Sequence, residues 1–479
     1  MCGILGIYGF DNVGSELIHG LSSLQHRGQD AAGALVFDEA FKIKKGLGLV
    51  NQVFTDKHVE YLQGHAGIGH VRYATQGSMN LINAQPFYVN YPFGIAMAHN
   101  GNVTNFNELK KTLHDDYHRL IETSNDLELI LYTLAAELEK KDLLKISHHE
   151  IFDAVATTQQ KVQGSYSVIS VVANHGFLVF RDPHGLRPLV MGKRETSKGT
   201  VYAFASETTC FDYLGYETVR DLLPGETVFI DAKTRQVHCR VTAKVTKPAF
   251  CVFEYIYFAR EDSLFNEKLV ATEREIMGHK LARHFKEKNL KPDIVIDIPS
   301  SSYFFAAGLA EELKVPYRRA LSKNNHVGRS FICPTHDERE RVVRQKLNPI
   351  RDIIKDKKIA VVDDSIVRGT TSKHLVQLLR ERGAKEVYFV SASPPITHPC
   401  VYGVDMSIKQ ELLASNNSIE EIKNYIGADE MIYQSLEDLM EIYKDQPCCF
   451  ACFSGNYPTG VSLENLEQIE KERVCSKKT

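Results

Sequence analysis

The chain has 479 residues, too many for one ordinary hydrophobic core, and this length predicts two or three domains. Hydrophobic residues make up 43% and charged residues 24%, a balance typical of a soluble globular protein. The net charge of -3 argues against nucleic acid or an anionic membrane as a main partner. The apolar runs are too short to span a membrane. No basic segment precedes the apolar N-terminal stretch, so we expect a cytoplasmic protein without a secretory signal.

The first half of the chain is rich in short strand-like runs separated by glycine-containing turns. Apolar residues recur at helical spacing over residues 126–138, and a second helix is expected over residues 16–25. Strands are expected over residues 167–172, 177–180 and 201–205. Many strands with few alternating βαβ units indicate an α+β layered domain.

From about residue 270 onward, expected helices and strands alternate. The helices cover residues 276–286, 303–313 and 372–382, and the strands cover residues 294–298, 359–362 and 387–390. This alternation is typical of a doubly wound parallel sheet. We place the domain boundary so that one domain covers residues 2–235 and the other covers residues 236–479.

The sharpest local pattern is residues 359–371, with the sequence IAVVDDSIVRGTT. An apolar strand ends in Asp363 and Asp364, and a short loop with Gly369 then leads into a helix. Such a loop can direct backbone N–H groups and hydroxyls at a phosphate on the helix N-terminus. Two adjacent carboxylates suit ribose hydroxyls and Mg²⁺ better than phosphate. For an isolated Asp-Asp pair, the alternative is an exposed acidic turn after a buried strand.

The whole pattern resembles the phosphoribosyl pyrophosphate motif of type I phosphoribosyltransferases. The resemblance implies that Asp363 and Asp364 bind the ribose and Mg²⁺. It assigns the rest of phosphoribosyl pyrophosphate binding, including the 5-phosphate, to the following loop and helix start: Ser365, Arg368, Gly369, Thr370 and Thr371.

Cys2 is a candidate nucleophile. Removal of Met1 would give Cys2 both a thiol and a free α-amine. An α-amine, with an ordinary pKa of about 7.7–8.0, can act as general base for the thiol, whose thiolate then attacks an amide carbonyl. Taken alone, a cysteine at the second position is more often a coincidence than a catalytic residue.

The segments around Cys2 change that interpretation. They are residues 2–7 (CGILGI), 24–33 (LQHRGQDAAG), 69–75 (GHVRYAT) and 98–101 (AHNG). Together they resemble class II glutamine amidotransferase domains of the N-terminal nucleophile hydrolase superfamily. The resemblance implies that Arg72 binds the α-carboxylate of glutamine and Asp126 its ammonium group. It also implies an oxyanion hole made by the Asn100 side chain and the Gly101 N–H, with His26 and Arg27 in supporting roles.

A cysteine constellation stands out among the ten cysteines of the chain. Cys449 and Cys452 have the spacing of two ligands to one metal, and Cys251 and Cys400 can complete a set of four. Four thiolates suit zinc or an iron–sulfur cluster, and spacing alone favours zinc. We interpret Cys448 as a non-ligand. Cys210, Cys239, Cys333 and Cys475 are interpreted as ordinary thiols.

Both halves, in this order, resemble the amidophosphoribosyltransferase family over nearly the whole chain. Further matching segments are residues 181–188, 206–208 and 328–332. The resemblance implies an α+β N-terminal nucleophile hydrolase domain with αββα layers, then an α/β type I phosphoribosyltransferase domain with a parallel sheet. It implies transfer of glutamine-derived ammonia to phosphoribosyl pyrophosphate, giving 5-phosphoribosylamine, glutamate and pyrophosphate, the first step of de novo purine synthesis.

The same resemblance implies cofactors and partners. Residues 251–260, 393–403 and 449–455 are similar to the iron–sulfur branch of the family, which implies a structural [4Fe–4S] cluster on Cys251, Cys400, Cys449 and Cys452. One Mg²⁺ per subunit is expected at Ser301, Asp363 and Asp364, with Lys323 and Lys346 on phosphoribosyl pyrophosphate. The expected partners are L-glutamine and phosphoribosyl pyrophosphate as substrates, purine nucleotides as inhibitors, and further copies of the chain in a homotetramer.

The sequence departs from the family pattern at two loops. Ser300 stands where relatives usually carry an acid after the proline, and Asn325 and His326 stand where arginine and tyrosine are common. These departures favour one alternative, a catalytically impaired regulator that binds phosphoribosyl pyrophosphate. A second alternative is a glutamine-dependent aminosugar synthase, which would share the first domain but lack the Asp363-Asp364-Ser365 loop.

Overall fold

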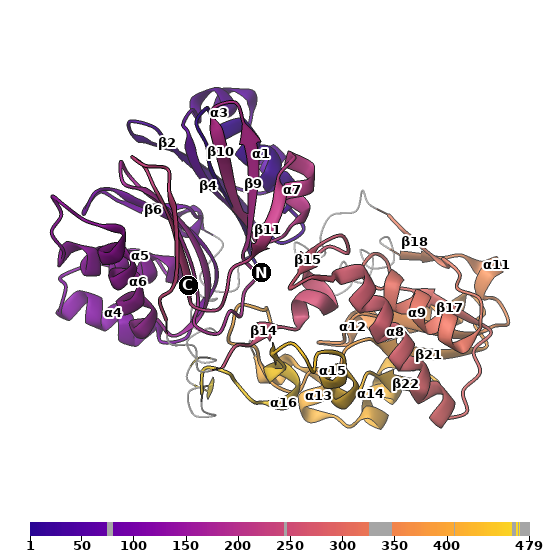
Figure 1. Cartoon of the computed structure of the whole chain (residues 1–479). Coiled ribbons are helices and arrows are strands. Elements are labelled where there is room, and N and C mark those ends of the chain that lie inside the picture. The colour runs from indigo at the N-terminus through magenta and orange to yellow at the C-terminus, as the bar shows by residue number, and fades with distance from the viewer. Residues whose placement is uncertain are drawn as a thin grey trace.

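The computed structural model of the chain describes residues 1–73, 80–243, 247–324, 347–406 and 408–461, together with residues 466, 467 and 469. The chain folds into two halves, and the N-terminus lies between them (Figure 1). Within the described part of the chain, none of the helices has the length and apolarity that a membrane crossing requires.

The first half contains two antiparallel sheets. One has the strand order β11-β9-β10-β1-β4-β2-β3, and the other has the order β13-β12-β8-β7-β6-β5. The strands of the first sheet are β1 (Gly3–Tyr8), β2 (Ala31–Phe37), β3 (Phe41–Leu47), β4 (Ala66–Arg72), β9 (Val190–Thr196), β10 (Gly199–Ala205) and β11 (Glu217–Asp221). Those of the second are β5 (Phe87–Val89), β6 (Ile95–Val103), β7 (Gly164–Val172), β8 (Gly176–Arg181), β12 (Glu226–Asp231) and β13 (Val237–Val241).

The alternation of side chains along β1 explains how these sheets are layered. Successive residues of a strand point to opposite faces. Ile4 and Tyr8 pack with residues of the second sheet such as Phe177, whereas Leu5 and Ile7 belong to the core that includes helix α1 (Gly14–Ser23). The helices α4 (Phe106–Asp115), α5 (Asp126–Glu139) and α6 (His148–Lys161) belong to the same half, and α5 packs against the second sheet. This arrangement confirms the predicted αββα layers.

The first half extends beyond the predicted boundary. Residues 235 and 236 lie in the turn between β12 and β13, and these two strands pair in register from Glu226↔Val241 to Ile230↔Val237. The second sheet therefore runs to Val241, and the connection to the second half follows it.

The second half is built on a parallel sheet with the order β17-β20-β21-β22, which confirms the predicted α/β class. The strands are β17 (Ile294–Asp297), β20 (Lys358–Asp363), β21 (Glu386–Ser391) and β22 (Glu430–Tyr433). Helices α8 (Val270–Glu287), α9 (Tyr303–Leu313), α12 (Thr370–Glu381), α14 (Ile419–Ile426) and α15 (Leu436–Ile442) accompany it. Ile294 and Ile296 enter one core and Val295 another, so β17 is buried on both faces.

Short elements complete the described chain. They are α2 (Val50–Val53), α3 (Asp56–Tyr61), η1 (Leu81–Asn83), α7 (Thr209–Leu214), β14 (Phe250–Cys251), η2 (Glu254–Phe258), β15 (Leu264–Phe265), β16 (Lys268–Leu269), β18 (Leu321–Lys323), β19 (Leu347–Pro349), α11 (Arg351–Ile354), η4 (Lys409–Glu411), α13 (Leu413–Asn416), β23 (Cys448–Cys449) and α16 (Ala451–Ser454). The parallel pair β14 and β23 joins the start of the second half to its C-terminal part.

Candidate active sites

Cys2 lies at the start of β1, beside the end of β4. The pairing Gly3↔Val71 brings Cys2 next to Arg72 and Tyr73, and the Cys2 thiol lies 3.6 Å from the Tyr73 carbonyl oxygen. Arg72 is buried. Burial lowers the pKa of Arg72, while the nearby Cys2, Asp30 and Asp126 oppose that shift. The structure therefore places the predicted carboxylate ligand, Arg72, within electrostatic reach of both the thiol and Asp126.

Asp126 opens helix α5, where Asn125 caps the helix by accepting a hydrogen bond from Leu127 N–H at 3.0 Å. The Oδ2 atom of Asp126 accepts a hydrogen bond of 2.8 Å from Val103 N–H. The Oδ1 atom of Asp126 lies 3.4 Å from Nε2 of His99. Burial opposes ionisation of this carboxyl, but His99 and the Val103 N–H together hold the pKa of Asp126 below its ordinary value. Asp126 is therefore a carboxylate suited to an ammonium group.

Gln85 fixes the tautomer of His99. The Oε1 atom of Gln85 accepts a hydrogen bond from His99 N–H at 2.8 Å, so its amide nitrogen must be the donor to Nδ1 of His99, also at 2.8 Å. Nδ1 is then the acceptor nitrogen, and the ring proton sits on Nε2, which faces Asp126.

The predicted oxyanion donors lie on β6. Asn100 is buried, and among the residues that the structure describes its Nδ2 atom has no hydrogen-bond partner. A buried donor without a partner is costly unless a ligand completes it, which fits the role predicted for Asn100. A side chain at Gly101 would overlap the carbonyl oxygen of Ser165 on the neighbouring strand β7, so only glycine fits there.

Met1 fills buried space between the two halves. Only 1% of its surface is exposed, and its sulfur contacts the Arg187 guanidinium. Burial lowers the pKa of the Met1 amine to about 5. While Met1 is attached, the nitrogen of Cys2 is an amide that cannot act as a base, so the predicted chemistry requires its removal.

Arg27 and His26 lie beside the predicted nucleophile and share one buried carboxylate, that of Glu207. Arg27 donates a hydrogen bond of 3.0 Å from Nε to the Cys2 carbonyl oxygen and forms an ion pair with Glu207. His26 lies 2.8 Å from the same carboxylate. Burial opposes ionisation of Glu207, but His26 and Arg27 hold its pKa well below the ordinary value.

The phosphate loop of the second half joins β20 to α12. Asp364 accepts hydrogen bonds from Ser301 and, at 2.7 Å, from Ser365. Burial, together with the adjacent Asp364, raises the pKa of Asp363 well above its ordinary value, and burial also raises the pKa of Asp364. Two adjacent carboxylates, with Asp364 buried and Asp363 half-buried, favour a bound cation.

The helix start after this loop is open to solvent. Gly369 precedes α12 with a φ of 73°, a left-handed conformation that favours glycine. Thr370 and Thr371 begin the helix and are exposed, so their hydroxyls and N–H groups can meet a phosphate. Arg368 forms an ion pair with Glu411, so its guanidinium would have to share or leave that carboxylate to bind phosphate.

The loop that carries Ser300 and Ser301 faces β18. The Nζ atom of Lys323 donates a hydrogen bond of 3.3 Å to the Ser300 hydroxyl, so Lys323 lies beside the predicted Mg²⁺ ligand Ser301. Lys346, Asn325 and His326 lie outside the described residues.

The four predicted cluster cysteines are all buried and reduced. Cys251 of β14 lies opposite Cys449 of β23 in the strand register. The Cys452 carbonyl oxygen accepts hydrogen bonds of 3.1 Å from the backbone N–H groups of Thr397 and His398, which are close to Cys400 in the sequence. Burial raises the pKa of Cys251 to about 11, and burial together with the other three cysteines raises the pKa of Cys452 well above its ordinary value. The structure thus brings the four thiols within electrostatic reach of one another.

No arrangement for a single metal ion accompanies them. Across the described residues, no group of three or more His, Cys, Asp or Glu side chains is positioned to hold one metal ion.

Burial, reinforced by Cys251, also raises the pKa of Cys448 far above its ordinary value.

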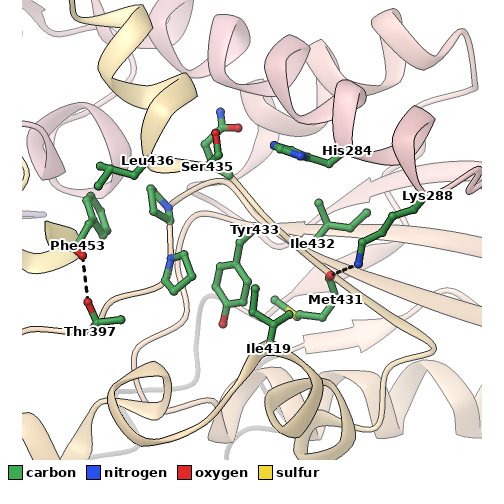
Figure 2. A pocket seen from close by; sticks show the side chains of 13 residues that line it. His284, Lys288, Thr397, Ile419, Met431, Ile432, Tyr433, Ser435, Leu436 and Phe453 are labelled. Carbon is green, nitrogen blue, oxygen red and sulfur yellow. Dashed lines mark hydrogen bonds between the residues drawn. The ribbon is translucent and has the colours of Figure 1, made fainter.

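A separate pocket lies beside β22, the edge strand of the parallel sheet. Its volume is about 400 Å³, and Figure 2 shows its mainly apolar wall, with His284 and Lys288 at one side. None of the predicted site residues lines it.

Two family models match the chain. A glutamine amidotransferase domain matches residues 70–213, and a phosphoribosyl transferase domain matches residues 269–395. The amidophosphoribosyltransferase of Pseudomonas aeruginosa is 44% identical over 99% of this chain and 96% of its own length. That of Saccharomyces cerevisiae is 42% identical over 99% and 95%.

The chain belongs to the amidophosphoribosyltransferase family.

Solved structures agree with this assignment. The glutamine phosphoribosylpyrophosphate amidotransferase of Bacillus subtilis, complexed with ADP and GMP, has a TM-score of 0.85 and 37% identity, covering 97% of this chain and 98% of that one. A structure described as the allosteric regulatory enzyme of purine biosynthesis has a TM-score of 0.87 and 36% identity, covering 98% and 99%. The amidophosphoribosyltransferase fold thus covers both halves.

Sequence reasoning assigned no role to Gln85, His99, Glu207 or Glu254. His99 and Glu207 lie in quoted motifs, yet their roles depend on partners distant in the sequence. Glu254 gave the clearest unused signal, because an acid flanked by Phe253 and Tyr255 in an apolar run requires a partner when buried.

Proposed function

We propose that this chain converts glutamine, phosphoribosyl pyrophosphate and water into glutamate, 5-phosphoribosylamine and pyrophosphate, the first step of de novo purine synthesis. One observation carries the proposal. The Cys2 thiol lies within electrostatic reach of the buried Arg72, which also interacts with Asp126, in one half of the chain, and an acidic loop between a strand and a helix lies in the other half.

The first half would release ammonia. With Met1 removed, the Cys2 amine takes the thiol proton, and the thiolate attacks the side-chain amide carbon of glutamine. Arg72 and Asp126 hold the two charged groups of the substrate backbone. The Asn100 amide and the Gly101 N–H stabilise the oxyanion. The protonated amine then gives its proton to the leaving ammonia, and water hydrolyses the thioester to glutamate.

The second half would consume that ammonia. Ammonia passes internally between the sites, because in bulk water near neutral pH it would be protonated and would lose its nucleophilic lone pair. The Asp363 and Asp364 carboxylates orient the ribose hydroxyls, and the start of α12 holds the 5-phosphate. Lys323 and Lys346 are proposed to meet the charge on the departing pyrophosphate as nitrogen attacks C1.

Mg²⁺ fits the acidic pair. The raised pKa values of Asp363 and Asp364 reflect negative charge that lacks compensation. We propose that these carboxylates and Ser301 hold one Mg²⁺ per subunit, which would neutralise charge on the pyrophosphate group.

Four buried thiols, drawn from three separate segments of the chain, are a ligand set that a [4Fe–4S] cluster can use. The guanidinium of Arg187 is buried close to Cys251 and Cys400. Burial lowers the pKa of Arg187, but negative charge on these two cysteines outweighs that effect and raises it. A buried cation at this place suits a cluster with a net negative charge. We propose a structural cluster on Cys251, Cys400, Cys449 and Cys452.

Three further properties are proposed from the family. Purine nucleotides inhibit the chain, in line with the ADP and GMP bound to the Bacillus subtilis relative. The chain assembles as a homotetramer. It acts in the cytoplasm, whose reducing conditions would keep its free thiols intact.

The test is a pair of assays on anaerobically purified protein with Met1 verifiably removed. Cys2→Ala should abolish glutamine-dependent pyrophosphate release and keep the rate with added ammonia. Equal loss of both rates would contradict the division of labour. A wild-type chain that binds phosphoribosyl pyrophosphate but releases no pyrophosphate with either nitrogen source would support the impaired-regulator alternative.

A further inference from the structure

A fully buried ion network joins the two halves directly behind Cys2. Arg27 donates from Nε to the Cys2 carbonyl oxygen at 3.0 Å. Its Nη1 and Nη2 atoms each donate a hydrogen bond of 3.0 Å to the two carboxylate oxygens of Glu254. The side chains of Arg27 and Glu254 are both 0% exposed. Glu254 therefore reaches from the second half to the residue that holds the nucleophile's main chain.

Glu254 is itself held rigidly by the second half. It begins the π-helical turn η2, which is closed by a hydrogen bond of 3.1 Å from Ala259 N–H to the Glu254 carbonyl oxygen. Arg274 of α8 is buried and donates hydrogen bonds of 2.8 Å to the carbonyl oxygens of Tyr255 and Ala259. Single π-helical turns are rare and occur often at functional sites.

The shape of the guanidinium makes this contact directional. Its five N–H groups lie in one plane, and a bidentate carboxylate fixes the orientation of that plane. When Glu254 holds Nη1 and Nη2, it also sets the direction of the Nε–H bond, which points toward the Cys2 carbonyl oxygen. That carbonyl is bonded to the Cα atom of Cys2, so its position limits where the thiol can lie.

Glu207 cannot replace Glu254 in this respect. It contacts Arg27 through the Nη1 atom alone, and its Oε2 atom is occupied by the Ser263 hydroxyl at 2.6 Å and Arg260 N–H at 3.1 Å. Glu207 balances the charge of Arg27 but does not set the plane of its guanidinium.

We propose that Glu254 is a positioning residue for the nucleophile: through its two-pronged contact with Arg27, the second half orients Cys2 for attack on the amide. This inference rests on the nucleophilic role proposed for Cys2. It makes the amidotransferase site incomplete without a side chain from the phosphoribosyltransferase half.

The test uses Glu254→Gln in the full chain with Met1 removed. Glutamine keeps the size of the side chain, but its amide nitrogen would face an N–H donor of Arg27, so the bidentate contact is lost. Glu207 still neutralises the charge of Arg27. We expect the kcat for glutamine hydrolysis to fall about 10- to 100-fold, since a small misplacement of a reacting group has this effect. The KM for glutamine and the ammonia-dependent rate should stay within about twofold of wild type.

A second measurement separates positioning from loss of structure. Alkylation of the Cys2 thiol by iodoacetamide needs no oxyanion hole and no oriented substrate, so its rate should be nearly unchanged in Glu254→Gln. Glu254→Asp keeps a two-oxygen carboxylate and should recover part of the lost kcat. The matched control is Glu226→Gln, which breaks the similar two-pronged Arg220 pair inside the first half and should leave kcat near wild type.

Two results would overturn the inference: a Glu254→Gln kcat near the wild-type value, or an equal fall in the glutamine- and ammonia-dependent rates. Failure of the proposed function is distinguishable from both, because the wild-type chain itself would then release no glutamate from glutamine.

Discussion

The Val103 N–H donates a hydrogen bond of 2.8 Å to the Oδ2 atom of Asp126. Val103 ends β6, the strand that carries the proposed oxyanion donors Asn100 and Gly101, and Asp126 begins α5. This one contact therefore fixes the proposed ammonium ligand relative to the oxyanion hole. In the proposed mechanism, the backbone of this one strand would couple substrate recognition to stabilisation of the transition state.

Asp126→Asn should weaken glutamine binding. Loss of a charge-assisted contact to the substrate ammonium is expected to raise the KM for glutamine about 10- to 100-fold, while the ammonia-dependent rate stays unchanged. Steady-state kinetics with both nitrogen sources measures this. Asp153→Asn, which removes a solvent-exposed partner of Arg240, serves as the control, and an unchanged KM in Asp126→Asn would contradict the assignment.

Asp126 should also contribute a pH-dependent part of stability. Its pKa is depressed, because His99 and the Val103 N–H outweigh the effect of burial. A carboxyl with a depressed pKa adds stability that is complete above its ordinary value of about 3.9 and is lost as the pH falls through the lower folded value. Chemical denaturation should show a constant difference in free energy of unfolding between wild type and Asp126→Asn above about pH 5. That difference should shrink below about pH 4, and a difference that widens on acidification would disprove this account.

Asn100→Ala should lower kcat without a matching change in KM. Removal of one oxyanion donor costs about 10²- to 10³-fold in kcat in comparable sites, and the Nδ2 atom has no partner in the described structure that would compensate. Asn102→Ala is the matched control. Asn102 lies two residues further along the same strand and donates to the Val401 carbonyl oxygen at 2.9 Å, so its loss should reduce stability more than kcat.

Asp364→Asn should affect the second half alone. We expect loss of pyrophosphate release with either nitrogen source and weaker Mg²⁺ binding, measured by calorimetry. Without Mg²⁺, the variant should unfold at a higher temperature than wild type, because one of two adjacent like charges has been removed. A lower unfolding temperature would show that the acidic pair is not strained in the free protein.

Cys400→Ser should remove the proposed cluster. Anaerobic wild-type protein is expected to contain iron and inorganic sulfide and to absorb visible light, whereas the variant should lose all three and unfold at a lower temperature. Cys210→Ser is the control, since Cys210 is equally buried but lies outside the cysteine set. Wild-type protein that binds zinc and no iron would contradict the cluster.

The regular elements were largely predictable from the sequence. Helix α9 spans Tyr303–Leu313 as expected, and α5 differs from its expected range by one residue, because both carry a continuous apolar face. Helix α8 begins at Val270 rather than at residue 276, since the buried Glu273 and Arg274 interrupt the apolar spacing in its first turns.

The contacts that organise the sites were not predictable in the same way. Arg27 and Glu254 are 227 residues apart, and no periodic pattern connects them. The His99 tautomer depends on Gln85, which approaches from a separate loop. Local chemistry in the sequence identified the groups proposed to meet substrate, whereas the groups that orient them depend on contacts between segments far apart in the sequence.

The buried network around Arg27 has a practical consequence for dissecting this molecule. If the two halves were expressed separately, Arg27 and Glu207 of the first half would become exposed to solvent. Glu254 of the second half would lose its ion-pair partner Arg27. Neither fragment should reproduce the behaviour of its half in the intact chain. Studies of either reaction in isolation are better done by inactivating one centre in the full-length polypeptide than by cutting it in two.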